Sequence, residues 1–384
     1  MATSESKPQR FLSKKTIFTC VVVCVLCAYG WITREVSLGV WVAARLFETN
    51  YFRTTFNPGY FSQEPEETPE EAMRSRKMEA AKLIGKAPRM LSGEMAEVHD
   101  AIIAVRGGEV PLRIYVPRVT TAAGRARAYK GVLVWIHGGG WLFGNVDAHD
   151  AMSRDMAEAS RMIVVSVGYR QSPEVRFPAP LKDCLAAIRW VNENIWAFGG
   201  DKNRIALVGE SSGGTLAIAT AMEMSKTWIP FVSRKSKLCA LVAASPPLSY
   251  DHAKQGSGEG GESDWGWRSY KRYATGYGLE AGQMKSYWDC YLRNEKDGRN
   301  PLAAPLRAKR WMLKGLPPVL LMRAEHEVLW DEIFEMGRNI ADAGPEVEEY
   351  QAKACIHGLF AKTGGSCGSD SLQRTAEFLE EKCS

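Results

Sequence analysis

The chain has 384 residues, of which 45% are hydrophobic and 24% are charged, and its formal net charge is +5 at pH 7. A chain of this length and composition can bury one substantial core, and α/β domains of this size are common as single units. The charge is mild and no basic cluster is interleaved with aromatic residues, which argues against nucleic acid as a partner.

The N-terminal segment is predicted to be a membrane anchor. Residues 16–33 read TIFTCVVVCVLCAYGWIT, carry no charge, and at about 1.5 Å per residue can cross a thin bilayer of roughly 27 Å. Four basic residues precede them, so residues 1–15 are expected to stay in the cytosol and the remainder to enter the lumen, with the endoplasmic reticulum as the expected membrane. The alternatives are secretion after cleavage of a signal peptide near Ala28–Gly30, and a buried soluble helix.

Residues 34–94 are predicted to form a linker and cap helices. A capping box at residues 68–71 should begin a helix that runs toward Gly85. Residues 95–384 are predicted to form the main domain, which opens with a hairpin over residues 97–117.

Strands and helices alternate through this domain. The strand candidates are VLVWI, MIVVSV, RIALV, LCALVAAS, PPVLLMRA and VEEYQA, and helices are expected over residues 179–194 and 331–344. Continuous apolar strands of this kind predict an α/β fold with a mostly parallel sheet and helices on both faces. Catalytic groups in such folds lie at the carboxyl ends of the strands.

The segment 250–300 interrupts this alternation and has little clear periodicity. Its stretch SGEGGES is typical of a disordered surface insertion. Large aromatic rings are costly to leave in water, however, and favour a cap over an apolar pocket. The rings in question are Trp265, Trp267, Tyr270, Tyr273, Tyr277, Tyr287 and Trp288.

Residues 209–213 read GESSG, the G-x-S-x-G spacing of a nucleophile elbow. In this turn a strand passes sharply into a helix, and glycine is needed on both sides because the backbone folds too closely for side chains. Ser211 holds the central position and is the predicted nucleophile. An ordinary strand-to-helix turn has the same composition, so the assignment depends on finding partners for the serine.

The strand VLVWI ends in HGGGW, and such a glycine run can direct backbone N–H groups at one point. A tetrahedral oxyanion requires this arrangement, and the N–H of Ser212, the residue after the nucleophile, is predicted to form the second half of the oxyanion hole. A flexible turn or a phosphate-binding loop are the alternatives, but the G-x-G-x-x-G spacing and the lysine of a P-loop are missing.

A carboxylate and a histidine follow the last two strand candidates. Glu327 comes after PPVLLMRA and His357 after the next strand, which gives the chain order serine, acid, histidine of α/β-hydrolases. His357 is the predicted base and Glu327 the predicted acid, although a solvated loop carboxylate is the alternative for Glu327. Asp331 is expected instead in the first turn of the following helix, and His326 at the surface or in support of the site.

In order, HGGGW, SVGYRQSPEVRFPAPLKD, GESSGG, HEVLWDE and HGLF resemble the motifs of the hormone-sensitive-lipase-like group of α/β-hydrolases over residues 95–382. The anchor ahead of a lumenal domain is similar to that of arylacetamide deacetylases and fungal steryl acetyl hydrolases. The resemblance implies a serine carboxylesterase without cofactor or metal, acting on acetyl or other short-acyl esters of hydrophobic alcohols, sterols among them. It assigns the nucleophile, acid and base to Ser211, Glu327 and His357. It likewise assigns the oxyanion donors to Gly138, Gly139 and Ser212.

The motifs depart from the group at three positions. Glu210 and Ser212 stand where Asp and Ala are usual, and Glu327 stands where Asp is more common. Two other functions remain open for the fold, namely an amidase or peptidase with the same triad and a catalytically inactive adhesion or scaffold protein.

Three of the nine cysteines lie within residues 16–33. A lumenal location would allow some of the others to form disulfides, but spacing does not select the pairs. These are Cys184, Cys239, Cys290, Cys355, Cys367 and Cys383. Among these six cysteines no C-x-x-C motif occurs, and no histidine cluster indicates a metal site.

Overall fold

A computed structural model describes residues 90–91, 94–118, 131–225, 238–256, 268–360 and 366–384. The predicted cytosolic tail, the predicted anchor and almost all of the predicted linker lie outside these ranges, as do Trp265 and Trp267. Within the described ranges, none of the helices combines the length and apolar character that a bilayer crossing requires.

The described residues contain an eight-stranded sheet in the order β1-β2-β4-β3-β5-β6-β7-β8. Strands β1 and β2 form the predicted hairpin, β2 pairs antiparallel with β4, and all other neighbours are parallel. The predicted mostly parallel sheet is therefore confirmed. The strands are β1 (Met95–Val105), β2 (Gly108–Pro117), β3 (Val132–Ile136), β4 (Ile163–Val167), β5 (Ile205–Glu210), β6 (Leu238–Ala244), β7 (Val319–His326) and β8 (Val347–Ile356).

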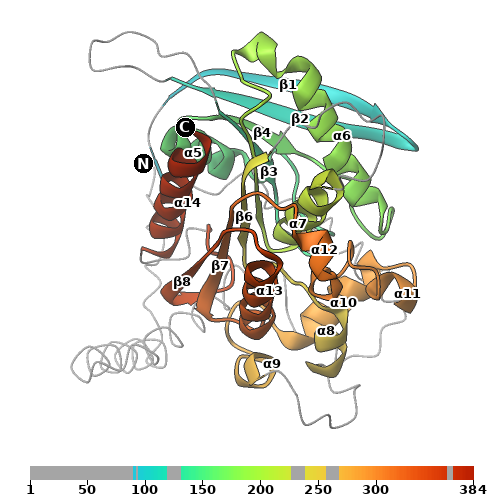
Figure 1. Cartoon of the computed structure of the whole chain (residues 1–384). Coiled ribbons are helices and arrows are strands. Elements are labelled where there is room, and N and C mark those ends of the chain that lie inside the picture. The colour runs from blue at the N-terminus through green and yellow to red at the C-terminus, as the bar shows by residue number, and fades with distance from the viewer. Residues whose placement is uncertain (1–89, 92–93, 119–130, 226–237, 257–267, 361–365) are drawn as a thin grey trace, which may run out of the picture.

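Helices cover both faces of the sheet, as Figure 1 shows. One face packs against α5 (Asp150–Ser160) and α14 (Cys367–Cys383), and the other against α6 (Ala179–Asn194), α7 (Ser212–Ser225) and α13 (Trp330–Ala343). The central strands β3 and β4 are buried at every residue because both faces are covered. Alternate strand residues therefore enter two separate apolar clusters, one on each face.

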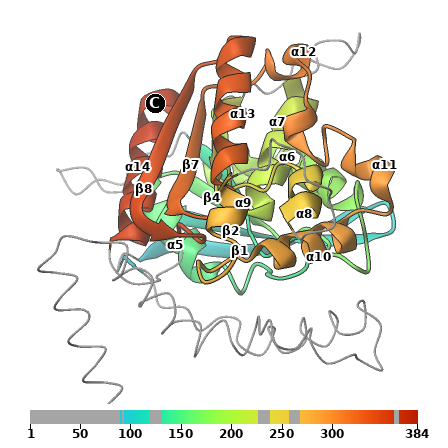
Figure 2. The ribbon, with the colours of Figure 1, turned by 90° about the horizontal axis from the view of Figure 1, so that it is seen from below.

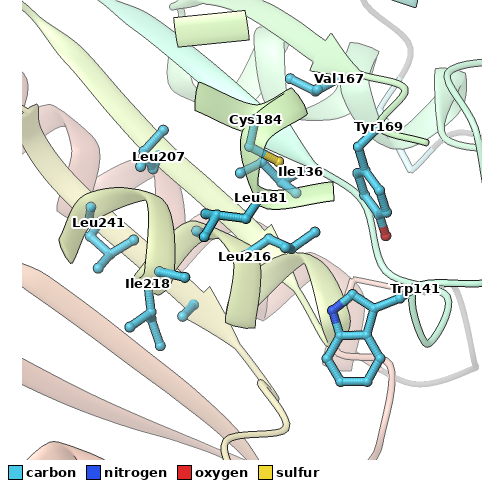
Figure 3. Close-up of a cluster of buried hydrophobic side chains, with 14 of the residues drawn as sticks. Ile136, Trp141, Val167, Tyr169, Leu181, Cys184, Leu207, Leu216, Ile218 and Leu241 are labelled. Carbon is cyan, nitrogen blue, oxygen red and sulfur yellow. The ribbon is translucent and has the colours of Figure 1, made fainter. Parts of the chain in front are cut away.

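The apolar cluster beneath α6 and α7 packs these helices against the sheet (Figure 3). Its drawn members include Ile136, Leu207 and Leu241 from the strands, with Leu181, Leu216 and Ile218 from the helices. Each of these side chains is at most 3% exposed, and burying one such side chain contributes about 1.5–3 kcal/mol. This packing holds β3 and β5 against α6 and α7.

The segment without clear periodicity forms short helices, namely α8 (Tyr250–Gly256), α9 (Arg268–Arg272), α10 (Ala281–Tyr291) and α11 (Glu295–Gly298). They gather at one end of the molecule, near α13 (Figure 2). Aromatic rings of α10 pack against the loop that follows β3: the ring centroids of Trp288 and Tyr291 lie 4.6 Å and 4.4 Å from that of Trp141. The remaining short helices are η3 (Ile195–Phe198), η4 (Pro305–Arg307) and α12 (Arg310–Leu313).

Two disulfides form among the described cysteines. Cys239 is bonded to Cys383 and Cys355 to Cys367, with Cα–Cα distances of 5.3 Å and 6.0 Å. These distances lie within the range that a disulfide can span. The pairing that sequence spacing leaves open is therefore decided by the fold, while Cys184 is a buried thiol in the core beneath α6.

Candidate active site

The turn between β5 and α7 brings Ser211 to the carboxyl edge of the sheet. Ser211 has a φ of 53°, which non-glycine residues rarely adopt, and its N–H donates to the carbonyl of Ala244 at 2.7 Å. A Cβ atom on Gly209 would lie 2.3 Å from the carbonyl oxygen of Gly213, and one on Gly213 would lie 2.0 Å from that of Ile136. Both glycines are thus required, and the turn has the geometry of a nucleophile elbow.

His357 follows β8 and lies between the two other predicted catalytic residues. Its Nε2 atom is 3.0 Å from Oγ of Ser211, and its Nδ1 atom is 3.0 Å from Oε2 of Glu327. The three residues come from the ends of different strands, and the structure brings them together in the order predicted. An imidazole placed in this way can take the serine proton while the carboxylate stabilises the resulting imidazolium.

Glu327 is completely buried and its second carboxylate oxygen is also occupied. Oε1 accepts hydrogen bonds from the N–H of Ala324 at 2.6 Å and from the hydroxyl of Ser245 at 3.0 Å. These donors stabilise a buried charge and fix the direction of the carboxylate. Sequence reasoning missed Ser245, although a polar residue directly after β6 is a signal for the carboxyl edge of the sheet.

Asp331 has a different environment from Glu327. It lies in the first turn of α13, and its Oδ2 atom accepts from the N–H of Ser269 in α9 at 2.8 Å. The hydroxyl of Ser269 donates to the carbonyl of Val328 at 2.7 Å. Asp331 therefore ties the cap to α13, whereas the carboxylate that contacts His357 belongs to Glu327.

The glycine loop after β3 lies against the elbow. A Cβ atom on Gly138 would lie 3.3 Å from Cβ of Ser211, and Gly139 has a φ of 119° that favours glycine. Among the turn and loop hydrogen bonds of the described residues, none is donated by the N–H of Gly138, Gly139 or Ser212. Ser212 is the first residue of α7, and the N–H group of a first helical residue has no partner within the helix. In the part of the chain that the structure describes, these three N–H groups therefore have no backbone acceptor.

Stacked rings support the glycine loop from within the protein. The ring of His137 lies 4.3 Å from that of Tyr169 and 5.0 Å from that of His149, and the Tyr169 hydroxyl donates to the carbonyl of His137 at 3.0 Å. Burial lowers the pKa of His137 to about 4, so this ring is neutral at pH 7. Tyr169 thus orders the glycine loop.

Glu210 joins the elbow to the histidine loop. Its Oε1 atom accepts from the N–H of Phe360 at 2.9 Å, three residues after His357. Burial raises the pKa of the Glu210 carboxyl above its usual range. Sequence reasoning noted Glu210 only as a departure from the usual Asp and did not predict this contact, which depends on the packing of Phe360 against the sheet.

The cap touches both the histidine loop and the glycine loop. A Cβ atom on Gly278 would lie 3.5 Å from the carbonyl oxygen of His357, and one on Gly140 would lie 2.8 Å from the ring of Tyr287. His326, directly before Glu327, packs against the rings of Tyr273 and Tyr277, at 5.7 Å and 5.8 Å between ring centroids. His326 is therefore a packed residue beneath the cap, in keeping with the predicted supporting role.

The two remaining histidines are each close to a carboxylate outside the proposed triad. His99 is exposed on β1 and contacts Glu97 at 2.7 Å, and His252 in α8 lies 4.0 Å from the buried Glu332. Among the described residues, the acidic side chains that could share a metal ion are Glu346, Glu348 and Glu381. The ammonium of Lys382 already lies within 2.6 Å of Glu346 and Glu381, so this cluster is an ion-pair network.

A nucleophile elbow at the carboxyl edge of a mostly parallel sheet is the feature that defines the α/β-hydrolases as a class. The sequence profile of a family described as having the α/β-hydrolase fold matches residues 133–361. The chain belongs to this family, in its hormone-sensitive-lipase-like group.

Known esterases are among the proteins similar to the chain. An arylesterase of Saccharolobus solfataricus is 31% identical over 264 residues, which cover 68% of this chain and 77% of the relative. Arylacetamide deacetylase of Bos taurus is 27% identical over 318 residues, covering 67% and 74%. The crystal structure of a thermostable esterase from Pseudomonas putida has a TM-score of 0.69 and 26% identity, covering 87% of this chain and 98% of the other. The chain is accordingly a carboxylic ester hydrolase.

Proposed function

We propose that the protein hydrolyses esters by acyl transfer through Ser211, His357 and Glu327. The observation that carries this proposal is the position of the His357 ring, 3.0 Å from the serine hydroxyl on one side and 3.0 Å from the buried carboxylate on the other. A serine hydroxyl is a weak nucleophile until a base of this kind takes its proton.

In the proposed mechanism, Nε2 of His357 takes the proton of Ser211 as Oγ attacks the ester carbonyl carbon. The carbonyl oxygen becomes an oxyanion and accepts hydrogen bonds from the N–H groups of Gly138, Gly139 and Ser212. The C–O bond to the alcohol then breaks, and the alcohol leaves with the proton of His357. Water, deprotonated by His357, attacks the acyl-enzyme, and the carboxylic acid is released from Ser211.

We further propose that the substrates are acetyl or other short-acyl esters of hydrophobic alcohols. The ring of Tyr287 lies against Gly140 of the glycine loop and 6.2 Å from the ring of Phe143, which supports an apolar wall beside the reacting carbonyl. Profiling p-nitrophenyl esters from C2 to C12 together with an acetylated sterol tests this proposal. A preference for long acyl chains would contradict it.

The name of the bovine relative, arylacetamide deacetylase, refers to an amide substrate and favours an amidase as the second candidate. Matched phenyl acetate and acetanilide substrates separate the two functions. We expect faster turnover of the ester, because an alkoxide or phenoxide is a better leaving group than an anilide. Faster turnover of the anilide would reverse the assignment.

A fluorophosphonate probe tests the nucleophile directly. Ser211→Ala should abolish both probe labelling and ester hydrolysis, while Ser212→Ala should retain much of both because its proposed contribution is a backbone N–H. Labelling that survives the first change and vanishes with the second would overturn the assignment. A wild-type protein that is not labelled would support the catalytically inactive alternative.

We also propose that residues 16–33 anchor the protein in the endoplasmic reticulum membrane with the catalytic domain in the lumen. Two disulfides in the described domain support an oxidising compartment. In sealed microsomes the domain should resist added protease and stay in the membrane pellet after carbonate extraction. Digestion without detergent would reverse the orientation, and release by carbonate would favour a cleaved signal.

A further inference from the structure

Both disulfides of the described residues end on the same helix. Helix α14 begins at Cys367, which is bonded to Cys355 at the end of β8, and it ends at Cys383, which is bonded to Cys239 at the start of β6. The helix is thus covalently attached to the sheet at its first and its last residue. The first attachment is next to the proposed active site, whereas the second is at the other end of the sheet.

The Cys355–Cys367 disulfide closes a short segment that contains the proposed base. Its cysteines are 12 residues apart, and His357 is the second residue after Cys355. Cys355 is only 3% exposed, and Leu359 and Phe360 of the same segment are buried in the cluster that includes α14. A displacement of Cys355 would therefore be passed directly to the imidazole.

The backbone that leads into this segment has an unusual conformation. Ala354 has a φ of 55°, and its N–H donates to Oε2 of Glu325 at 2.7 Å. The pairing of β7 with β8 also shifts in register between Ala324 and His326, next to Glu327. Regular strand pairing thus ends before His357. Beyond this point the Cys355–Cys367 disulfide links the chain covalently to α14.

The Cys239–Cys383 disulfide lies at the other end of the sheet. Cys239 is the second residue of β6 and so lies where this strand begins. Ser245, which contacts Glu327, follows the opposite end of the same strand. This disulfide spans 144 residues of chain and encloses most of the cap and the last two strands. Its removal should weaken the fold without moving His357 relative to Ser211.

We propose that the Cys355–Cys367 disulfide is a positioning element of the active site, which holds the His357 imidazole in register with both Ser211 and Glu327. This inference rests on the proposed roles of those three residues. A link between the ends of a short segment removes most of its alternative conformations. Proton transfer through His357 requires hydrogen-bond distances to both neighbours, so a loosened segment populates the reactive arrangement less often.

The experiment compares two double variants, each of which lacks one of the two disulfides of α14. The first variant carries Cys355→Ser and Cys367→Ser, and the second carries Cys239→Ser and Cys383→Ser. Losing the first disulfide should lower kcat on p-nitrophenyl acetate by about 10- to 100-fold, with KM changed less than about threefold. It should also move the acidic limb of the kcat/KM profile to lower pH, because a looser contact with Glu327 stabilises the imidazolium less. Losing the second should lower Tm and leave kcat and the pH profile near those of the wild type.

The inference is overturned if the first variant keeps the wild-type kcat and pH profile, or if both variants lose kcat to the same extent. Should the first variant fail to fold, graded reduction of the wild-type protein with a phosphine, with each disulfide followed by mass spectrometry, provides the same comparison. Loss of kcat should then track the reduction of Cys355–Cys367. Failure of the proposed function has a separate signature, since the wild-type protein would then show no Ser211-dependent hydrolysis.

Discussion

The carboxylate of Glu327 contacts the ring of His357 through Oε2, while Oε1 is held by the backbone of Ala324 and the hydroxyl of Ser245. Glu327→Gln should therefore lower kcat by as much as ~10⁴ with little loss of thermal stability, because an amide cannot stabilise the imidazolium or select the ring tautomer. Steady-state kinetics and thermal unfolding of the same preparation check this expectation.

Asp331→Asn is the matched control for Glu327→Gln. It should cost about 0.3–1 kcal/mol of stability through the dipole of α13, with kcat nearly unchanged. The assignment of the acid is wrong if the kinetic collapse occurs in Asp331→Asn while Glu327→Gln stays active.

Ser245→Ala removes one hydrogen bond to the buried carboxylate. We expect kcat to fall by about tenfold, since a hydrogen bond to a charged group contributes about 1.5–3 kcal/mol and water can replace part of it. Ser166→Ala is the control, because Ser166 is a buried serine of β4 whose hydroxyl has no hydrogen-bond partner among the described residues. Equal kcat values for the two variants would show that Ser245 does not act through Glu327.

Glu210 should matter as a hydrogen-bond acceptor and not as a charge. Glu210→Gln keeps an oxygen for the N–H of Phe360 and is expected to retain most of kcat, whereas Glu210→Ala should lower it by about tenfold through a buried unsatisfied N–H. Burial raises the pKa of the Glu210 carboxyl and so disfavours its charged form, which is why we expect the neutral Gln side chain to replace it. A Gln variant as impaired as the Ala variant would show that the charge itself is required.

The stability of the fold should fall below pH 6.5. Burial lowers the pKa of His137 to about 4 and that of His149 to about 3, so between these values and 6.5 the unfolded chain binds protons that the folded chain excludes. These two histidines therefore leave the free energy of unfolding unchanged above pH 6.5. Below pH 6.5 they lower it as the pH falls, each by up to about 1.4 kcal/mol per pH unit.

Urea unfolding between pH 8 and pH 5 measures this dependence. His149→Gln should reduce the change in the free energy of unfolding per pH unit. His99→Gln, a change at an exposed position on β1, should leave that change as it is in the wild type. A wild-type stability that does not change between pH 7 and pH 5 would contradict the neutral, buried state of the two rings.

The features that the sequence alone predicts are local or follow from strand order. The elbow around Ser211 is local in sequence, because its motif spans five residues and a Cβ atom on Gly209 would collide with the carbonyl of Gly213 within them. The requirement for glycine at Gly213 comes instead from the carbonyl of Ile136 on the neighbouring β3. The positions of Glu327 and His357 follow from strand order, since parallel strands all end at the same edge of the sheet. For this reason the residues of the proposed triad could be selected from motifs and from their order in the chain.

Other features were decided only by the tertiary structure. The contacts from Ser245 to Glu327 and from Phe360 to Glu210 join residues 82 and 150 positions apart, and no spacing rule predicts them. The cap helices are short, and helices of one to three turns depend on packing of their aromatic rings and not on a periodic pattern. The pairing of Cys355 with Cys367, and of Cys239 with Cys383, was likewise undetermined, because a disulfide forms between residues whose Cα atoms the fold brings within about 4–7 Å.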